Sequence, residues 1–220
     1  MPSRLVGLGQ ALPPPAKSPR TARTPAPPAA SACLENILIE KLNFFVFTGG
    51  PGVGKTALIR HLEGRGEHVV EETHRAVIAE QVAGGGRATP WDDHAAYCEL
   101  CVRRDLRKFD ALSHEAGRVF FDRGILDGFD PRWDAPPALI AAARARRYNP
   151  RVFVFPPWRE IYRTDAERRQ DWAEAEATFG RILAGLDRFS YRPVIVPRAT
   201  VEARAAFVLE LALRASVSPT

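Results

Sequence analysis

The sequence predicts an α/β fold in which a five-stranded parallel sheet lies between helices on both of its faces. Five short runs of β-branched or aromatic residues follow one another from Leu42 onward, and helical stretches separate them. Most of these runs are apolar throughout, which is typical of strands buried on both faces. Regular alternation of strands and helices favours a parallel sheet.

The expected strands and helices can be placed along the chain. The strand candidates are Asn43–Thr48, His68–Glu71, Val119–Asp122, Val152–Phe155 and Val194–Val196. Helices are expected over residues 54–62, 73–84, 136–147, 165–187 and 199–213. One more helix should begin with Thr89 as its cap and Pro90 at its first position. Asp92 and Asp93 would then lie in its first turn, where acidic side chains are favourable.

The first 35 residues are predicted to be a disordered tail, and residues 36–220 a single folded domain. Residues 1–34 hold eight of the 19 prolines, mixed with alanine, serine and threonine. Such a segment buries too little apolar surface to offset its chain entropy. Its arginines and its lack of acidic residues also resemble an organellar transit peptide, but it has no clear amphipathic helix. A plain tail, or a start codon placed too early, is the favoured interpretation.

The net charge of +5 is weak support for a polyanionic partner. Arg4, Lys17, Arg20 and Arg23 all lie in the tail, which has no acidic residue, so the remaining chain is nearly neutral. No apolar stretch approaches the ~18 residues that a membrane helix needs. We therefore expect a cytoplasmic protein without a membrane span, and a nucleic-acid-binding module ranks last among the functions considered.

The three cysteines do not form the pattern of a disulfide-rich protein. Cys98 and Cys101 make a lone CxxC inside an expected helix, and a zinc site would need two further ligands at suitable spacing. Cysteines in the core or on a helix face, in a reducing compartment, are the favoured interpretation.

A glycine-rich segment joins the first strand to the first helix. It matches GxxxxGK[ST], the Walker A pattern, in the strand–loop–helix context that makes the motif credible. Glycines let the backbone amides point at phosphates, and the following helix adds the positive end of its dipole. A lysine in the motif reaches the terminal phosphates and a threonine binds Mg²⁺. The residues predicted to bind ATP or GTP are Gly49, Gly50, Pro51, Gly52, Val53, Gly54, Lys55, Thr56 and Ala57.

This motif makes the expected fold a P-loop NTPase three-layer sandwich. A chance match in a glycine-rich turn is the alternative, but the chain has only four lysines and places one of them, Lys55, in the motif. Many such loops have a second hydroxyl where this chain has Ala57. Its loss should weaken nucleotide binding by ~0.5–1.5 kcal/mol, the value of one hydrogen bond.

Two strand ends carry carboxylates beside the predicted loop. Val119–Asp122 is an apolar strand that ends in an acid, as in a Walker B element, so Asp122 is predicted to bind Mg²⁺ together with Thr56. The alternative is that Asp122 caps the next turn. Arg123 would position an anionic group during phosphoryl transfer. Glu72 could bind or deprotonate an acceptor hydroxyl. Arg75 would lie one turn later on the same helical face, so an ordinary surface ion pair between Glu72 and Arg75 is an equal alternative.

A charged segment over residues 156–169 follows the fourth strand. Its arginines recur at about helical spacing, and a lid that closes over a triphosphate would place them on phosphate oxygens. We predict catalytic roles for Arg159 and Arg163 and a substrate contact for Arg168. A solvated helix with local ion pairs is the alternative.

Taken together, these motifs resemble the NadR-like AAA domain family of P-loop proteins. The shared pattern covers residues 43–213 and comprises Gly49–Thr56, Glu72 with Arg75, Asp122-Arg123-Gly124 with Asp127, Trp158 to Arg168, and Pro197 with Arg204. Leu126 stands where this family is expected to have proline. The family includes the nicotinamide-riboside-kinase part of NadR and the TRPL translocation defect protein of flies. The resemblance implies a kinase-like P-loop fold, ATP or GTP binding and a substrate-side role for Asp127, but not which reaction occurs.

The expected function is therefore phosphoryl transfer from ATP or GTP to a small-molecule acceptor, or NTP hydrolysis, with Mg²⁺. The second hypothesis is a regulatory nucleotide-binding switch that turns over slowly and acts through a protein partner. A Ras-type switch is disfavoured, because the chain has no NKxD or DxxG motif.

Overall fold

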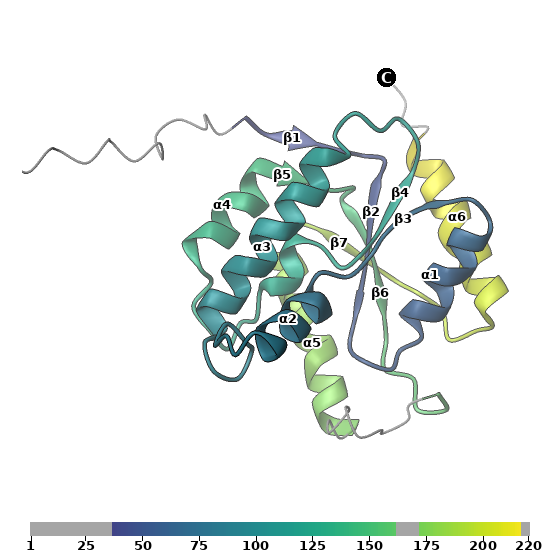
Figure 1. Ribbon diagram of the computed structural model, residues 1–220. Helices are drawn as coiled ribbons and strands as arrows, with labels where there is room; N and C mark the ends of the chain where they lie inside the picture. Colours follow the sequence, from purple (N-terminus) through teal and green to yellow (C-terminus); the bar gives the residue numbers. More distant parts are fainter. Residues whose placement is uncertain (1–36, 162–171, 217–220) are drawn as a thin grey trace, which may run out of the picture. The chain divides into compact units, whose positions relative to one another are not determined.

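The computed structural model describes residues 37–161 and 172–216. In these ranges a five-stranded parallel sheet has the order β3-β4-β2-β6-β7 (Figure 1). Its strands are β2 (Phe44–Gly49), β3 (His68–Val70), β4 (Val119–Asp122), β6 (Arg151–Phe155) and β7 (Arg192–Ile195). The predicted α/β fold with a five-stranded parallel sheet is confirmed.

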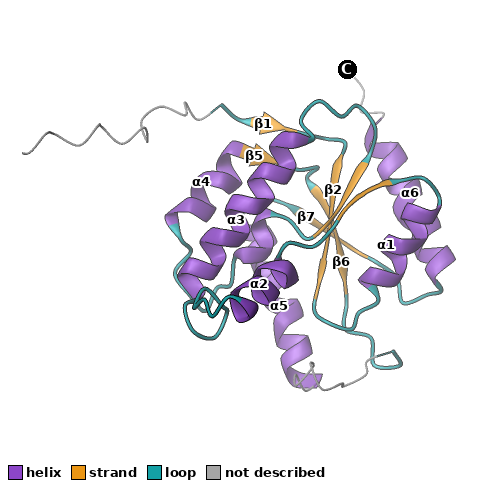
Figure 2. Ribbon diagram, viewed as in Figure 1, coloured by secondary structure: helices purple, strands orange, loops and turns teal. Residues whose placement is uncertain are grey.

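Helices cover both faces of this sheet (Figure 2). The helices in the described ranges are α1 (Lys55–Gly64), α2 (His74–Ala83), α3 (His94–Ala111), the short 3-10 helix η1 (Ile125–Gly128), α4 (Pro137–Ala145), α5 (Trp172–Arg188) and α6 (Val201–Ser216). None of them is both long enough and apolar enough to cross a lipid bilayer.

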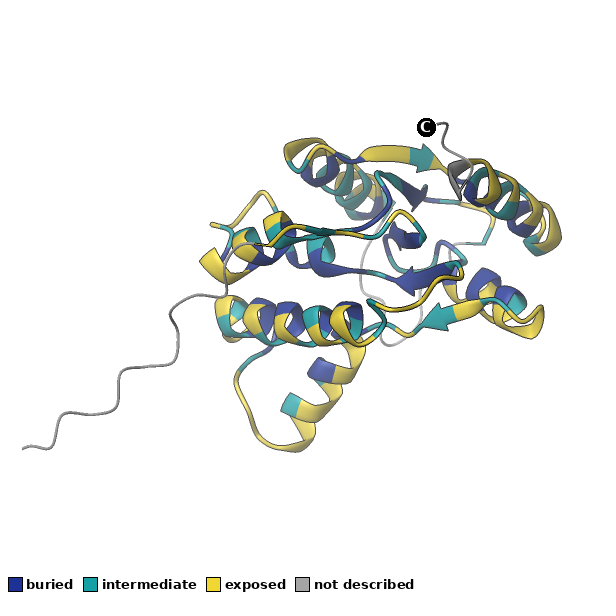
Figure 3. Cartoon of the chain, turned by 90° about the horizontal axis from the view of Figure 1, so that it is seen from above, coloured by how far each residue is buried: buried dark blue, intermediate teal, exposed yellow. Residues whose placement is uncertain are grey.

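The central strand β2 explains why the sheet has two cores. Successive side chains of a strand point to opposite faces. Phe45 and Phe47 pack with α1 and α6 on one face, while Phe44 and Val46 pack with α3 and α4 on the other. The central strands β2, β4 and β6 are accordingly buried between helices whose outer surfaces are exposed, whereas the edge strands β3 and β7 are partly exposed (Figure 3).

The strand order brings three loops to one edge of the sheet. In the parallel pair β2–β4, Phe47 lies opposite Asp122, and in β3–β4, Val70 lies opposite Phe121. The chain therefore leaves β2, β3 and β4 at neighbouring points. In open parallel sheets, ligands bind outside the carboxyl ends of the strands, so this edge is where a site is expected.

The prediction of the start of α3 was wrong. The helix begins at His94, and its cap is Asp93, whose Oδ1 accepts a hydrogen bond of 3.0 Å from the amide of Ala96. Thr89 instead closes a local turn, since its hydroxyl accepts from the amide of Asp92 and donates to that residue's carboxylate. Short polar side chains readily form such turns in competition with a helix.

Other boundaries differ by smaller amounts. Residues 146–147, expected in a helix, form strand β5 (Arg146–Arg147), which pairs in parallel with β1 (Ile39–Glu40). Strand β3 ends one residue before the predicted Glu71, and β7 begins two residues before Val194. The first part of the helix expected over 165–187 lies outside the described residues.

The two described cysteines are buried and unpaired on α3, as predicted. Burial raises the pKa of Cys98 to about 11 and that of Cys101 to about 12, so both are neutral thiols at pH 7. The Cys98 thiol donates to the carbonyl of Gly128 at 3.3 Å, which ties α3 to η1.

Candidate functional site

The predicted phosphate loop joins β2 to α1 and depends on three glycines in the left-handed region. The φ angles of Gly49, Gly52 and Gly54 are 148°, 75° and 80°. A Cβ on Gly49 would lie 2.8 Å from the carbonyl oxygen of Phe155, and a Cβ on Gly54 would lie 2.8 Å from Nη1 of Arg204. The lack of space and the backbone conformation therefore both require glycine at positions 49 and 54.

Lys55 is buried at the start of α1 and folds back over this loop. Its Nζ donates to the carbonyls of Gly49 at 3.0 Å and Gly50 at 3.3 Å. Burial, followed by the nearby charge of Arg123, lowers the pKa of Lys55 to about 8. A bound anion would favour the charged form of this ammonium group.

Asp122 ends β4 beside the loop and has an unusual environment. Among the described residues its buried Oδ1 has no hydrogen-bond partner, and burial raises the pKa of this carboxyl group. A buried carboxylate oxygen without a donor is a costly arrangement unless a cation or ligand completes it.

These features fit a magnesium ion held jointly with a nucleotide. Mg²⁺ prefers oxygen ligands, and in nucleotide sites one or two protein ligands usually share it with phosphates. The Asp122 carboxylate and the hydroxyl of Thr56, exposed in the first turn of α1, supply such oxygens. The described residues contain no group of three or more His, Cys, Asp or Glu side chains arranged to hold a metal.

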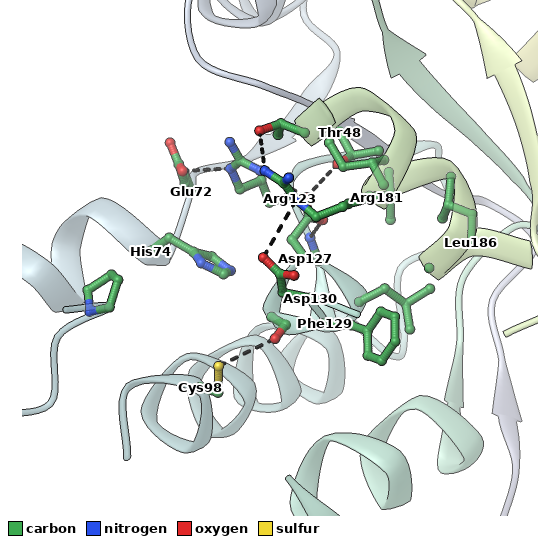
Figure 4. A pocket seen from close by; sticks show the side chains of 18 of the residues that line it. Thr48, Glu72, His74, Cys98, Arg123, Asp127, Phe129, Asp130, Arg181 and Leu186 are labelled. Carbon is green, nitrogen blue, oxygen red and sulfur yellow. Dashed lines mark hydrogen bonds and ion pairs between the residues drawn. The ribbon is translucent and has the colours of Figure 1, made fainter. Parts of the chain in front are cut away.

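Arg123 links the loop to the other strand ends. Its φ of 68° is left-handed, which is unfavourable for a residue with a side chain. Its side chain donates from Nε to Glu72 at 2.7 Å, from Nη1 to Asp127 at 3.0 Å, and from Nη2 to the carbonyl of Gly49 at 3.1 Å. Figure 4 shows the guanidinium between the two carboxylates. These bonds hold a strained backbone in place, as is common at functional sites.

The two carboxylates around Arg123 are themselves fixed. Asp127 Oδ1 also accepts from the hydroxyl of Thr48 at 2.5 Å, and its Oδ2 accepts from the amide of Gly124 at 2.9 Å. Glu72 Oε2 lies 3.1 Å from Nε of Arg75. Burial alone would lower the pKa of Arg123, but Asp127, Glu72 and Asp122 outweigh burial and raise it. Arg123 is therefore permanently charged.

A cavity of about 430 Å³ lies beside the loop, and Arg123 is one of the residues that line it. Of the predicted substrate-binding residues, Glu72, Arg75, Arg123 and Asp127 all line it. The other walls come from β2, α2, α3, η1, the loop before α4, and α5. They include residues that the sequence analysis did not single out: Thr48, His74, His94, Tyr97, Trp133 and Arg181. No motif marks these residues, because they are dispersed over the chain and meet only in the folded protein.

Residues 44–204 match the AAA domain family. The chain belongs to this family. No curated protein matches it in sequence. Membership implies a nucleotide-binding P-loop NTPase, in agreement with the geometry of the glycine loop. The narrower resemblance to NadR-like proteins is not established by this match.

The predicted lid of this AAA domain protein lies only partly within the described residues. Arg159 is exposed, and its guanidinium stands over the ring of Trp172 at 5.4 Å. Arg163 and Arg168 fall outside the described ranges, so their predicted roles are untested. Arg204 is buried nearby; it donates to the carbonyl of Gly54 at 3.2 Å and lies 5.6 Å from the ring centre of Trp158.

Proposed function

We propose that this AAA domain protein transfers the terminal phosphoryl group of ATP or GTP to a small-molecule acceptor. The observation that carries the proposal is the cavity of about 430 Å³ next to the glycine loop, with Arg123 shared between the two. A nucleotide hydrolase or a slow switch does not need a space for a second small molecule beside the loop. A phosphotransferase also needs a second, separate space for the acceptor.

On the nucleotide side, residues 49–57 would hold the phosphates with backbone amides and with Lys55. Thr56 and Asp122 would hold Mg²⁺, which neutralises charge on phosphate oxygens during transfer. Arg159, with Arg163 and Arg168, would close over the triphosphate, exclude water and meet the developing charge. Exclusion of water matters because water would otherwise compete with the acceptor for the phosphoryl group.

On the acceptor side, Arg123 would orient the transferred group. Its Nη2 bonds to the loop at Gly49 while its Nε and Nη1 bond to Glu72 and Asp127 in the cavity wall. Glu72 Oε1 accepts from Arg123 and Oε2 forms an ion pair with Arg75, which fixes the carboxylate without using all of its lone pairs. Glu72 can thus still accept a hydrogen bond from an acceptor hydroxyl. The resemblance to the nicotinamide-riboside-kinase part of NadR supports an acceptor of small size.

The test is acceptor-dependent turnover. The full chain is incubated with Mg²⁺ and either ATP or GTP, and with a panel of nucleosides and vitamin-like compounds, while release of ADP or GDP is followed. Release that rises with one acceptor, together with a phosphorylated product, supports the proposal. Tight nucleotide binding with no turnover above the acceptor-free control would instead support the regulatory switch with a protein partner.

A further inference from the structure

One wall of the cavity carries a histidine that the proposed chemistry does not use. His74 is the first residue of α2 and is 9% exposed. Its Nδ1 lies 3.0 Å from the hydroxyl of Tyr97 on α3. Its Nε2 is buried and has no hydrogen-bond partner among the described residues. Figure 4 shows the ring extending from its helix toward the centre of the cavity.

The polar groups beside His74 differ from it, because they already have partners. Glu72 accepts from Arg123 and forms an ion pair with Arg75, and Asp127 accepts from Arg123, Thr48 and Gly124. Within the described part of the chain, the other buried side-chain atoms without a partner belong to His61, Asp122 and Arg204, which do not line this cavity. Burying a polar atom without a partner costs free energy, so His74 Nε2 points to a group supplied by a ligand.

The ionisation of His74 restricts what that group can be. Burial, followed by the charge of Arg123, lowers the pKa of His74 to about 4, so the imidazole is neutral at pH 7. A neutral ring offers Nε2 either as an N–H donor or as a lone-pair acceptor, depending on the bond between Nδ1 and Tyr97. A hydroxyl group satisfies both cases, because it donates and accepts. A phosphate or carboxylate satisfies only one.

We propose that His74 Nε2 binds a hydroxyl group of a small molecule in this cavity, and that the molecule also carries an apolar or aromatic part. The apolar or aromatic part of the ligand is inferred from two rings that line the cavity. The rings of His94 and Trp133 stack with their centroids 5.3 Å apart at an interplanar angle of 28°. Trp133 is 54% exposed and so presents ring surface that a ligand could cover. This inference deepens the proposed function, since it names the chemical class of the acceptor.

Two substitutions separate the roles of the ring nitrogens. In His74→Asn the amide takes the place of Nδ1 and keeps the bond to Tyr97, but nothing replaces Nε2. In His74→Gln the amide takes the place of Nε2. Tyr97→Phe is the matched control, because it removes the partner of Nδ1 and leaves Nε2 unchanged.

The probes are hydroxyl compounds with a planar ring for which deoxy counterparts exist: adenosine and uridine with their 2′-, 3′- and 5′-deoxy forms, and pyridoxine with 4-deoxypyridoxine. Binding is measured by calorimetry, with and without a non-hydrolysable ATP analogue. At least one probe should bind the wild type about 10-fold more tightly than its deoxy form, the effect of one buried hydrogen bond. His74→Asn should bind the hydroxyl probe about 10-fold more weakly than the wild type does and should bind the deoxy form equally well. His74→Gln should recover part of the lost affinity.

The outcomes also separate this inference from the proposed function. Unchanged probe affinity in His74→Asn, equal losses for the hydroxyl and deoxy forms, or no binding by any probe would each overturn the inference. Phosphoryl transfer that is insensitive to His74→Asn would overturn it while leaving the proposed function standing. Probe binding that depends on His74 without any phosphoryl transfer would support it and count against the proposed function.

Discussion

The phosphate loop and the neighbouring cavity meet at Arg123, yet they are built in opposite ways. The loop is a single run of residues from Gly49 to Thr56, and its shape depends on glycine backbone angles. The cavity is assembled from side chains on β2, α2, α3, η1 and α5, which are separated by long stretches of sequence. A site made from one stretch of backbone leaves a signature in the sequence, whereas a site made by tertiary packing does not.

Their electrostatics differ as well. The loop side carries a buried ammonium group and a carboxylate oxygen that has no hydrogen-bond partner among the described residues. The cavity side carries carboxylates that arginines already neutralise, and a neutral histidine. The loop is therefore suited to a highly charged ligand and the cavity to a nearly neutral one. The following four experiments test this contrast.

The largest effect is expected where the two regions join. Arg123→Ala should destabilise the protein by about 3–5 kcal/mol, because it leaves the buried carboxylate of Asp127 without its cation. It also leaves the carboxylate of Glu72 with Arg75 alone. Arg123→Gly should be about 1 kcal/mol more stable than Arg123→Ala, because glycine adopts the left-handed φ of 68° without strain. Urea unfolding of both variants measures the difference. Equal stabilities would contradict the left-handed backbone at this residue.

The next effect concerns a buried carboxyl group on the cavity side. Asp105 on α3 accepts a hydrogen bond from the hydroxyl of Thr73, the residue before α2. Burial raises the pKa of Asp105 to about 7, against partial opposition from that bond and from the charges of Lys108 and Arg123. The folded protein therefore holds this proton more tightly than the unfolded chain does. The free energy of unfolding therefore falls as pH rises from about 4 to about 7, and it falls no further through this group above pH 7.

Asp105→Asn should remove this loss of stability while keeping an oxygen for Thr73. At pH 8 the variant should be more stable than the wild type by on the order of 3 kcal/mol, and the difference should shrink toward pH 4. Denaturant unfolding at both pH values is the measurement. A difference that does not change with pH would show that the carboxyl group is not buried in its neutral form.

A smaller effect should be confined to the loop side. Lys55→Ala should weaken nucleotide binding roughly 100-fold, since a charge-assisted contact to phosphate contributes about 2–3 kcal/mol. The protein should stay folded, and compounds bound in the cavity should keep their affinity. Lys41→Ala is the control, because Nζ of Lys41 bonds to the carbonyls of Ser113 and Glu115. Nucleotide affinity that survives in Lys55→Ala would refute the assignment of the loop.

The smallest effect tests the one unusual position of the loop. Ala57→Ser should restore a hydroxyl in the first turn of α1 and strengthen nucleotide binding by ~0.5–1.5 kcal/mol. Calorimetric titration with the nucleotide measures the gain. An unchanged or lower affinity would mean that the phosphate does not approach this position.

The same contrast explains which parts could be predicted from the sequence. Alternating apolar runs and helices predicted the sheet, and the strand ending at Asp122 was placed with its observed bounds. The burial pattern of a parallel strand is local, so it can be recognised without knowing its neighbours. The carboxylates at Glu72 and Asp122 were placed at the observed edge for the same reason, although their roles remain predictions.

The sequence analysis missed features that depend on competing hydrogen bonds or on contacts between residues far apart in the sequence. Thr89 has the side chain of a helix cap, but its hydroxyl bonds to Asp92 and the helix starts later. The pairing of Ile39 with Arg146 joins residues too far apart for any local pattern. His74 follows the predicted Glu72 closely, yet only its contact with Tyr97 and its unpartnered nitrogen distinguish it from a surface histidine.

The position of Arg123 has a consequence for thermodynamics. One guanidinium bonds to Gly49 in the loop and to Glu72 and Asp127 in the cavity wall, so neither region can shift it without disturbing the other. Two ligands, one bound at the loop and one in the cavity, would therefore be cooperative, of either sign. By linkage, each would change the affinity of the other by the same factor.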